Sequence, residues 1–323
     1  MHFGELKKSV SEEIKPIYYI EGEDAFLREN ALRTIFSAAL SEPDFNLNCF
    51  VGQEMKNNPE AVLTAVRSYP FMSDKRVVVI REYYPSAQDL KNKTVKEILS
   101  GTEETTVLVI VNSEKSEAIK KQDMITLVDC SKLDRETIAK YIRRECSAFG
   151  IVAEREAIDM LTDYASSDMT KISGEVKKLT AYIGDNGELT VEAVEDVCVK
   201  DTEYQVYELA EYIAAKNEKK AFETLTDMLD KNTDKQRLFI SVYYHFRRLL
   251  HSAVSACSDK ELAAALGVKE YAVKKSRVQA KKFTPKRLKK ICDKLSYLDS
   301  AFKSGEVTVD SALWNSVFNA ITG

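Results

Sequence analysis

The loop after the first strand-like segment is where nucleotide chemistry would be expected. A phosphate-binding loop needs glycines that bring backbone amides onto the phosphates, a lysine for charge and a hydroxyl for magnesium. Residues 21–27 read Glu-Gly-Glu-Asp-Ala-Phe-Leu, which supplies one glycine and three carboxylates. Because carboxylates repel a triphosphate, the sequence predicts that this loop binds no ATP.

Other arrangements of reactive residues point the same way. A magnesium-binding strand should end in acidic residues, but the strand-like residues 106–111 are followed by Asn112 and Ser113. No G-x-S-x-G or H-E-x-x-H motif occurs, and the six cysteines lack metal-ligand spacing, so reduced thiols are expected. His245 and His251 lie six residues apart on one apolar helix and therefore on different faces. We expect no catalytic residue, no cofactor and no metal.

The bulk composition limits the possible partners. A chain of 323 residues suits two or three domains. A net charge of −4 gives no global sign of nucleic-acid binding. No run of about 18 apolar residues occurs, and residues 1–16 lack an apolar stretch of signal-peptide length. We expect a cytoplasmic protein with no membrane contact.

The elements that must position any site alternate in the first third of the chain. Strand-like and helix-like segments in turn predict a mainly parallel sheet with helices on its faces. The strands are expected at residues 17–22, 45–51, 76–82, 106–111 and 124–130, and the helices at 24–40, 59–67 and 88–100. The first domain is thus an α/β domain over residues 1–133.

From residue 134 onward the strand pattern disappears. Short helices predict a small helical domain at 134–203, with Thr190 as an N-cap. Longer helices predict an all-α domain at 204–323. Its helix ends are marked by a capping box at Ser258 and Glu261, by Thr284 before Pro285, and by Gly305.

The connection at residues 67–76, Arg-Ser-Tyr-Pro-Phe-Met-Ser-Asp-Lys-Arg, places bulky apolar side chains between a helix and a strand. Such connections are usually polar and exposed. We expect Pro70 to end the helix after Tyr69 and to restrict the backbone before Phe71. Either Phe71 and Met72 pack under the sheet as core, or they stay exposed for a partner.

Residues 260–282 suggest an alternative function. Ala263, Gly267 and Val273 have the spacing of a helix-turn-helix motif, and residues 269–303 contain twelve basic residues against three acidic ones. A recognition helix in a DNA major groove needs such charge. The alternatives are therefore a DNA-binding regulatory protein and a plain helical hairpin with a basic face.

The ordered segments resemble the delta subunit family of the bacterial DNA polymerase III clamp loader. Residues 16–32 resemble its first strand, vestigial nucleotide loop and first helix, and residues 68–80 its clamp-contacting segment. Residues 170–184 and 189–197 resemble its lid, and residues 206–229, 245–250 and 296–305 its collar. The similarity covers nearly the whole chain in the right order.

The resemblance implies an AAA+-like fold without an ATPase or polymerase site, followed by a helical lid and an all-α collar. It implies a subunit of the DNA polymerase III holoenzyme, in a heteropentamer whose collar joins it to ATPase subunits and a delta-prime-like subunit. Such a subunit binds the sliding clamp (beta) and holds its ring open for loading on primed DNA during replication. Contact with primer-template DNA would be nonspecific.

The resemblance also implies which residues bind the clamp. In the family, two adjacent apolar side chains at a helix end enter a pocket on the clamp, and Pro70 and Phe71 match them here, with Met72 next. Many relatives have Leu-Phe where this chain has Pro-Phe. That difference makes Phe71 the better-supported anchor and leaves the contribution of Pro70 open. The helix-turn-helix pattern falls in the collar, where helices pack subunit against subunit.

Overall fold

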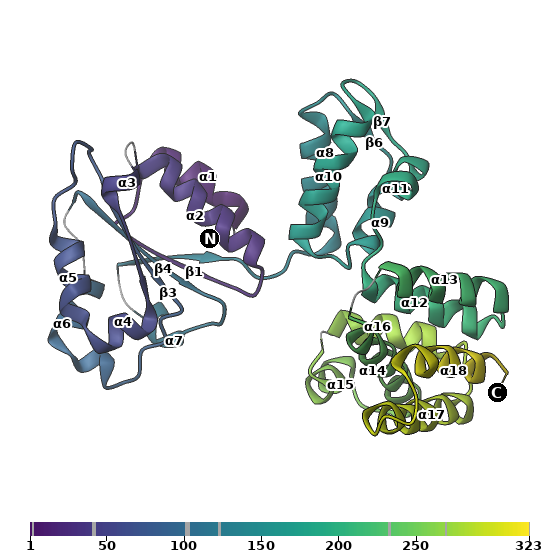
Figure 1. The fold of residues 1–323 in the computed structure, drawn as a ribbon. Coiled ribbons are helices and arrows are strands. Elements are labelled where there is room, and N and C mark those ends of the chain that lie inside the picture. Colours follow the sequence, from purple (N-terminus) through teal and green to yellow (C-terminus); the bar gives the residue numbers. More distant parts are fainter. Residues whose placement is uncertain are drawn as a thin grey trace. The chain divides into compact units, whose positions relative to one another are not determined.

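A computed structural model describes residues 1, 3–40, 43–100, 104–121, 124–231, 234–268 and 270–322. The chain divides into two compact units, whose elements are labelled in Figure 1. Unit 1 comprises Met1–Glu145 and Asp168–Val176, and unit 2 comprises Cys146–Ser167 and Lys177–Gly323. The finer division into three domains at 1–133, 134–203 and 204–323 stays a prediction.

Unit 1 contains a five-stranded sheet in the order β2-β3-β4-β1-β5, and every pairing is parallel. Its strands are β1 (Ile17–Glu21), β2 (Leu47–Val51), β3 (Arg76–Arg81), β4 (Thr106–Asn112) and β5 (Ile125–Asp129). All seven residues of the central strand β4 are buried, as expected for a parallel strand covered on both faces. The predicted parallel α/β class is therefore confirmed.

Alternate residues of each strand face opposite layers of helices. Tyr18 and Ile20 of β1 pack with α1 and α2, whereas Ile17 and Tyr19 pack with α4, α5, α6 and α7. Figure 1 shows the first pair of helices and the α4–α6 group on opposite sides of the sheet. The helices of this unit are α1 (Phe3–Glu12), α2 (Ala25–Ala39), α3 (Pro43–Asn46), α4 (Gly52–Asn57), α5 (Pro59–Arg67), α6 (Lys93–Ser100) and α7 (Glu117–Lys120), with a 3₁₀ turn at Asp89–Lys91.

The next part of the chain is helical, as expected. It contains α8 (Arg135–Ser147), α9 (Arg155–Tyr164), α10 (Met169–Ile183) and α11 (Val191–Val197). Thr190 caps α11 by accepting a hydrogen bond from the amide of Ala193 at 3.3 Å. The expectation that strands end at residue 134 is wrong in one detail: β6 (Val152–Ala153) and β7 (Glu188–Leu189) form a short parallel pair. Two-residue strands are too short to leave an alternating pattern.

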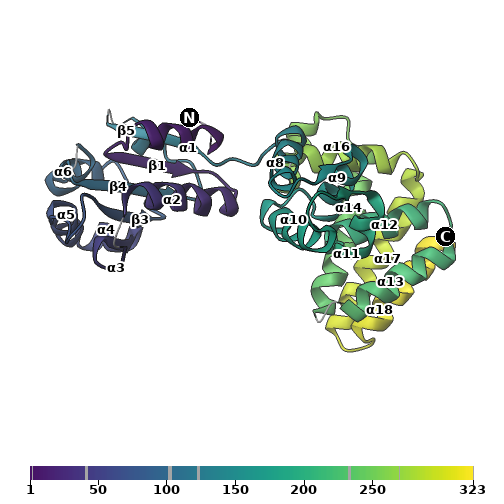
Figure 2. The same ribbon diagram turned by 90° about the horizontal axis from the view of Figure 1, so that it is seen from above.

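Within the described residues, the last part of unit 2 contains seven helices, seen from above in Figure 2. These are α12 (Thr202–Ala214), α13 (Glu218–Lys231), α14 (Lys235–Val254), α15 (Asp259–Leu266), α16 (Glu270–Ala280), α17 (Pro285–Lys303) and α18 (Val309–Thr322). Six of them contribute to one apolar core, whereas α15 packs against α16 in a separate small cluster. The predicted capping box at Ser258 and Glu261 is present, and Thr284 caps α17. Gly305 follows α17 with a left-handed φ of +83°. Among the described residues, none of the helices is both long enough and apolar enough to cross a membrane.

Candidate functional site: an exposed aromatic tip

The loop after β1 packs tightly against the backbone that follows β5. Gly22 has a φ of +140°, and a Cβ at this position would lie 2.2 Å from the carbonyl carbon of Cys130. The Asp24 carboxylate accepts the amide of Leu27 at 3.1 Å and so caps the N-terminus of α2. The helix N-terminus, which in a phosphate-binding loop faces the ligand, already has a carboxylate there. Burial raises the pKa of Asp24.

The end of β4 has a structural role. The Asn112 side chain is fully buried; its amide donates to the carbonyl of Tyr83 at 2.7 Å and its oxygen accepts the Tyr83 amide at 3.0 Å. Glu21, at the end of β1, is buried and forms an ion pair with Lys120 at 2.7 Å. In the part of the chain that the structure describes, no group of three or more His, Cys, Asp and Glu side chains could hold a metal ion.

The connection from α5 to β3, here called the tip loop (residues 68–75), exposes its large apolar side chains. Phe71 is 56% exposed and Met72 is 83% exposed, and Tyr69 beside them is also exposed, whereas Pro70 is half-buried. The interpretation that Phe71 and Met72 fill the core is therefore wrong. Met72 has a φ of +48°, a left-handed conformation that is uncommon for a residue with a side chain.

Helix α5 has the bounds expected for the helix at residues 59–67, but it ends before the point at which Pro70 was expected to end it. Its last residue is Arg67, and Ser68 is the C-cap in extended conformation, so the predicted end after Tyr69 is wrong by two residues. The hydroxyl of Ser68 donates to the carbonyl of Thr64 at 2.6 Å. A proline also disfavours the helical conformation of the residue before it, which explains why Tyr69 lies outside the helix.

Asn46, at the end of α3, fixes the backbone of the tip loop. Its side-chain amide donates to the Phe71 carbonyl at 2.9 Å, and its side-chain oxygen accepts the Phe71 amide at 2.7 Å. Asn46 is fully buried, so these two hydrogen bonds are shielded from competing water. These bonds fix the backbone of Phe71, whose ring is exposed.

A second aromatic side chain extends the exposed surface. Phe45 is 65% exposed, and its ring centroid lies 5.4 Å from that of Phe71. Neither Phe45 nor Asn46 was identified from the sequence, because both were assigned to a strand starting at residue 45. Nothing local in the sequence signals their proximity to Phe71, which is 25 positions from Asn46.

Arg76, the first residue of β3, holds the start of the tip loop at Tyr69. One terminal nitrogen of Arg76 donates to the Tyr69 carbonyl at 3.2 Å, and the other donates to the side chain of Asn48. Arg76 is buried, and this burial lowers the pKa of its guanidinium. The tip loop is thus bonded at two points to the region where β2 and β3 begin.

The helix-turn-helix pattern forms a real hairpin of α15 and α16, with Gly267 at a φ of +64° and Val273 buried. Arg277, a basic residue of α16, is engaged internally. The guanidinium donates to the carbonyls of Ser252, Ser255 and Cys257 and pairs with Asp259 at 2.6 Å. Lys274, which is exposed on α16, pairs with Glu270. These internal bonds engage two of the basic side chains that a DNA-reading helix would need free.

Comparisons with known proteins match most of the chain. The family described as "DNA polymerase III, delta subunit" matches residues 18–139, and the family described as "DNA polymerase III delta subunit, C-terminal domain" matches residues 203–317. DNA polymerase III subunit delta of Bacillus subtilis is 22% identical over 322 residues, covering 93% of this chain and 90% of that one. The probable subunit delta of Mycoplasma genitalium is 26% identical over 201 residues, covering 62% and 67%.

A solved structure shares the fold. The Bacillus subtilis DNA clamp loader delta protein superposes with a TM-score of 0.78 at 20% identity, over 99% of this chain and 100% of that chain. The likeness includes both the parallel sheet of unit 1 and the helices that follow it.

Proposed function

Because the chain belongs to the family of DNA polymerase III delta subunits, we propose that it binds the sliding clamp through the tip loop and holds the ring open during loading. In this proposal Phe71 is the main anchor and Met72 a second contact, while the half-buried Pro70 shapes the backbone. The supporting observation is the exposure of Phe71 and Met72 on a loop whose backbone is fixed by Asn46. We further propose that Phe45 belongs to the same binding surface.

The tip loop suits a binding role for two physical reasons. Large apolar side chains near the centre of an interface usually dominate its affinity. A backbone that is already fixed loses less conformational freedom on binding, so more of the contact energy remains as affinity. The unbranched Met72 side chain adapts to an irregular pocket.

The work that this subunit performs on the clamp would be mechanical. A binder shifts a closed ring toward the open form only if it binds the open form more tightly than the closed one. The chain itself would not hydrolyse ATP, since the backbone at Cys130 packs closely against Gly22 in the loop after β1, and the Asn112 side chain is hydrogen-bonded to the Tyr83 backbone. Partner subunits that hydrolyse ATP would control access to the tip loop. Contact with primer-template DNA would be nonspecific.

The test is coprecipitation of the purified chain with the sliding clamp of the same organism. Phe71→Asp is expected to abolish clamp binding while leaving the unfolding temperature nearly unchanged, since the ring is already exposed. Phe318→Asp is the matched control, because Phe318 has the same 56% exposure on α18 and lies outside the proposed surface. Clamp binding by Phe71→Asp at the wild-type level would disprove the role of the tip loop.

A further inference from the structure

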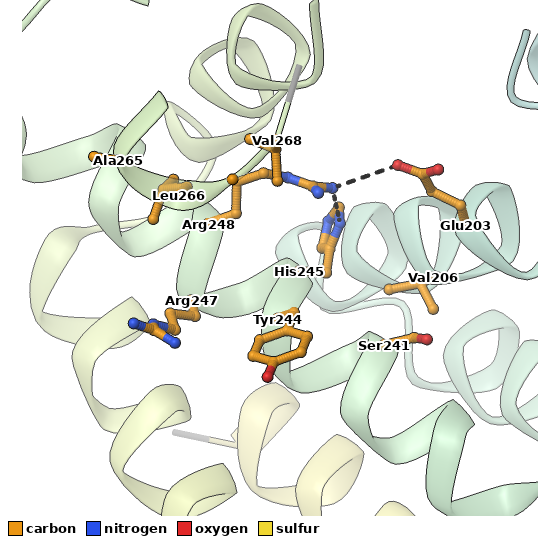
Figure 3. Close-up of a pocket in the computed structure, with 11 residues that line it drawn as sticks. Glu203, Val206, Ser241, Tyr244, His245, Arg247, Arg248, Ala265, Leu266 and Val268 are labelled. Carbon is orange, nitrogen blue, oxygen red and sulfur yellow. Dashed lines mark hydrogen bonds and ion pairs between the residues drawn. The ribbon is translucent and has the colours of Figure 1, made fainter. Parts of the chain in front are cut away.

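Outside the tip loop, carboxylates of the chain approach polar donors in contrasting ways. In a pocket of unit 2 lined by α12 and α14, the Glu203 carboxylate lies 3.9 Å from the Arg248 guanidinium (Figure 3). At that distance the two groups form no short hydrogen bond. Directly after β3, by contrast, the Glu82 carboxylate is bonded to several donors at once. The second arrangement defines the geometry in which an anion is held.

The Glu82 carboxylate accepts hydrogen bonds from the segments that follow β3 and β4. Its Oε2 accepts from the hydroxyl of Ser113 at 2.9 Å and from the hydroxyl of Tyr84 at 2.5 Å. The amide of Ser113 lies 3.2 Å from both carboxylate oxygens. One backbone donor and two hydroxyl donors therefore converge on a single negative charge.

These donors are held by bonds that do not involve Glu82. The Tyr84 hydroxyl accepts the amide of Glu114 at 3.0 Å, which fixes its position and leaves its proton for donation. Ser113 follows Asn112, whose buried side chain is bonded to both backbone groups of Tyr83. Removal of the Glu82 side chain would therefore leave the donors in place without an acceptor.

The backbone of Glu82 is fixed independently of its side chain. Its φ of +54° is left-handed, which is uncommon for a residue other than glycine and costs free energy. The Glu82 amide donates to the Val111 carbonyl at 2.8 Å, and a Cβ at Gly52 would lie 2.1 Å from the Glu82 carbonyl oxygen. Alanine or glutamine at position 82 would share this backbone conformation, so substitutions there change only what the side chain does.

The surroundings of Glu82 favour a negative charge. Although partial burial acts in the opposite direction, hydrogen bonds from Tyr84 and Ser113 lower the pKa of Glu82, and the Arg28 cation adds to this effect. Hydrogen bonds to an ionised acceptor are stronger than those between neutral groups. The position also lies at the C-terminal edge of the sheet, where ligands of parallel α/β sheets bind.

We propose that Ser113 and Tyr84 form an oxyanion-binding site, and that the Glu82 carboxylate is a tethered anion that occupies it. The class of ligand is a small carboxylate or phosphate group. Because the tethered carboxylate has a high effective concentration at the site, it excludes free anions from this edge of the sheet. The inference goes beyond clamp binding: it gives the chain a barrier to nucleotide phosphates that is independent of the loop at Gly22.

The experiment empties the site and asks whether a free anion refills it. Glu82→Ala should lower the unfolding temperature by about 2–4 °C, the shift expected for one lost interaction in a chain of this size. Sodium acetate or sodium phosphate at about 100 mM should reverse at least half of this loss, relative to sodium chloride at the same ionic strength. Glu82→Gln is the matched control, because it also removes the charge but keeps an amide in the position. Glu82→Gln and wild type should show no such difference between the salts.

The outcomes separate a site from a general salt effect. Equal responses of Glu82→Ala and Glu82→Gln to acetate and phosphate, or no response of Glu82→Ala to either, would overturn the proposal. If Glu82→Ala were unfolded in chloride, acetate or phosphate should restore its fold, and failure of both would also overturn it. A larger effect of acetate would identify the ligand as a carboxylate, and a larger effect of phosphate would identify it as a phosphate group.

A second variant tests the donors directly. Adding Ser113→Ala to Glu82→Ala removes one hydroxyl donor, so the anion concentration needed for half of the stabilisation should rise at least about fivefold. An unchanged concentration would refute the assignment of Ser113 to the site. The sliding clamp takes no part in these measurements, so their result is independent of the proposed function.

Discussion

Truncation of Phe71 to alanine should weaken clamp binding by a factor that the structure predicts. An aromatic side chain contributes about 150–250 Å² of surface, and 56% of Phe71 is exposed, which leaves about 110 Å² to be covered by the clamp. At about 25 cal/mol per Å² this area is worth about 2.8 kcal/mol. The dissociation constant for the clamp should therefore rise about 100-fold.

Asn46 should act on the clamp only through Phe71. Asn46→Ala removes both hydrogen bonds to the Phe71 backbone, and freeing one loop residue costs about 1–2 kcal/mol of ordering on binding. The single variant should weaken binding about tenfold. In the Phe71→Ala background, Asn46→Ala should add almost nothing, because the ring it presents is gone.

These affinities are measured by surface plasmon resonance with immobilised clamp, and urea unfolding of each variant controls for stability. Phe71→Ala should leave the free energy of unfolding within about 1 kcal/mol of wild type, since it loses mainly the contact with Phe45. A dissociation constant within threefold of wild type for Phe71→Ala would refute the area argument. Additive effects of the two truncations would refute the positioning role of Asn46.

Three further predictions concern His245, Gly22 and the binding of ATP. Burial, and then the Arg248 cation, lower the pKa of His245 to about 3. Between pH 6.5 and 3 the unfolded chain binds a proton at His245 that the folded chain does not, so the free energy of unfolding should fall by about 2 kcal/mol from pH 7 to pH 5. In His245→Gln this fall should be absent. Urea unfolding measures both, and equal pH profiles for the two proteins would contradict the prediction. Gly22→Ala should lower the free energy of unfolding by at least about 2 kcal/mol, because its Cβ meets Cys130 at a φ of +140°; an unaffected urea midpoint would contradict the closed loop. Millimolar Mg-ATP should leave the unfolding temperature unchanged, and a concentration-dependent rise would show a nucleotide site.

Local pattern was sufficient to predict most of the fold. The run Thr-Val-Leu-Val-Ile-Val at residues 106–111 could only be a buried strand or a short buried helix segment, and its β-branched residues favour the strand. Helix ends with a capping residue, such as Ser258 and Thr284, were predicted correctly because the cap and its partner lie within three residues of each other. Such short-range chemistry can be read directly from the chain.

The candidate site could be predicted only in part, because its support comes from distant residues. The apolar run at 69–72 was visible in the sequence, but its exposure was not, since a buried and an exposed Phe71 look alike in a sequence. Phe45 continued the pattern of the strand after it, yet α3 places it in a helical turn. The hydrogen bonds from Asn46 to Phe71 depend on how β2 and β3 align in the sheet, which no short window of sequence specifies.

The parallel sheet places the loop at Gly22 and the tip loop at opposite edges. Leu47 lies opposite Val77 in the register of β2 and β3, so Asn46 and Arg76, the residues before them, are neighbours at the N-terminal edge of the sheet. The tip loop is bonded to this edge. The loop at Gly22 follows β1 at the C-terminal edge, where ligands of parallel α/β sheets bind. Because the two edges are separated by the length of the strands, a substitution at Gly22 should leave the hydrogen bonds that hold Phe71 intact.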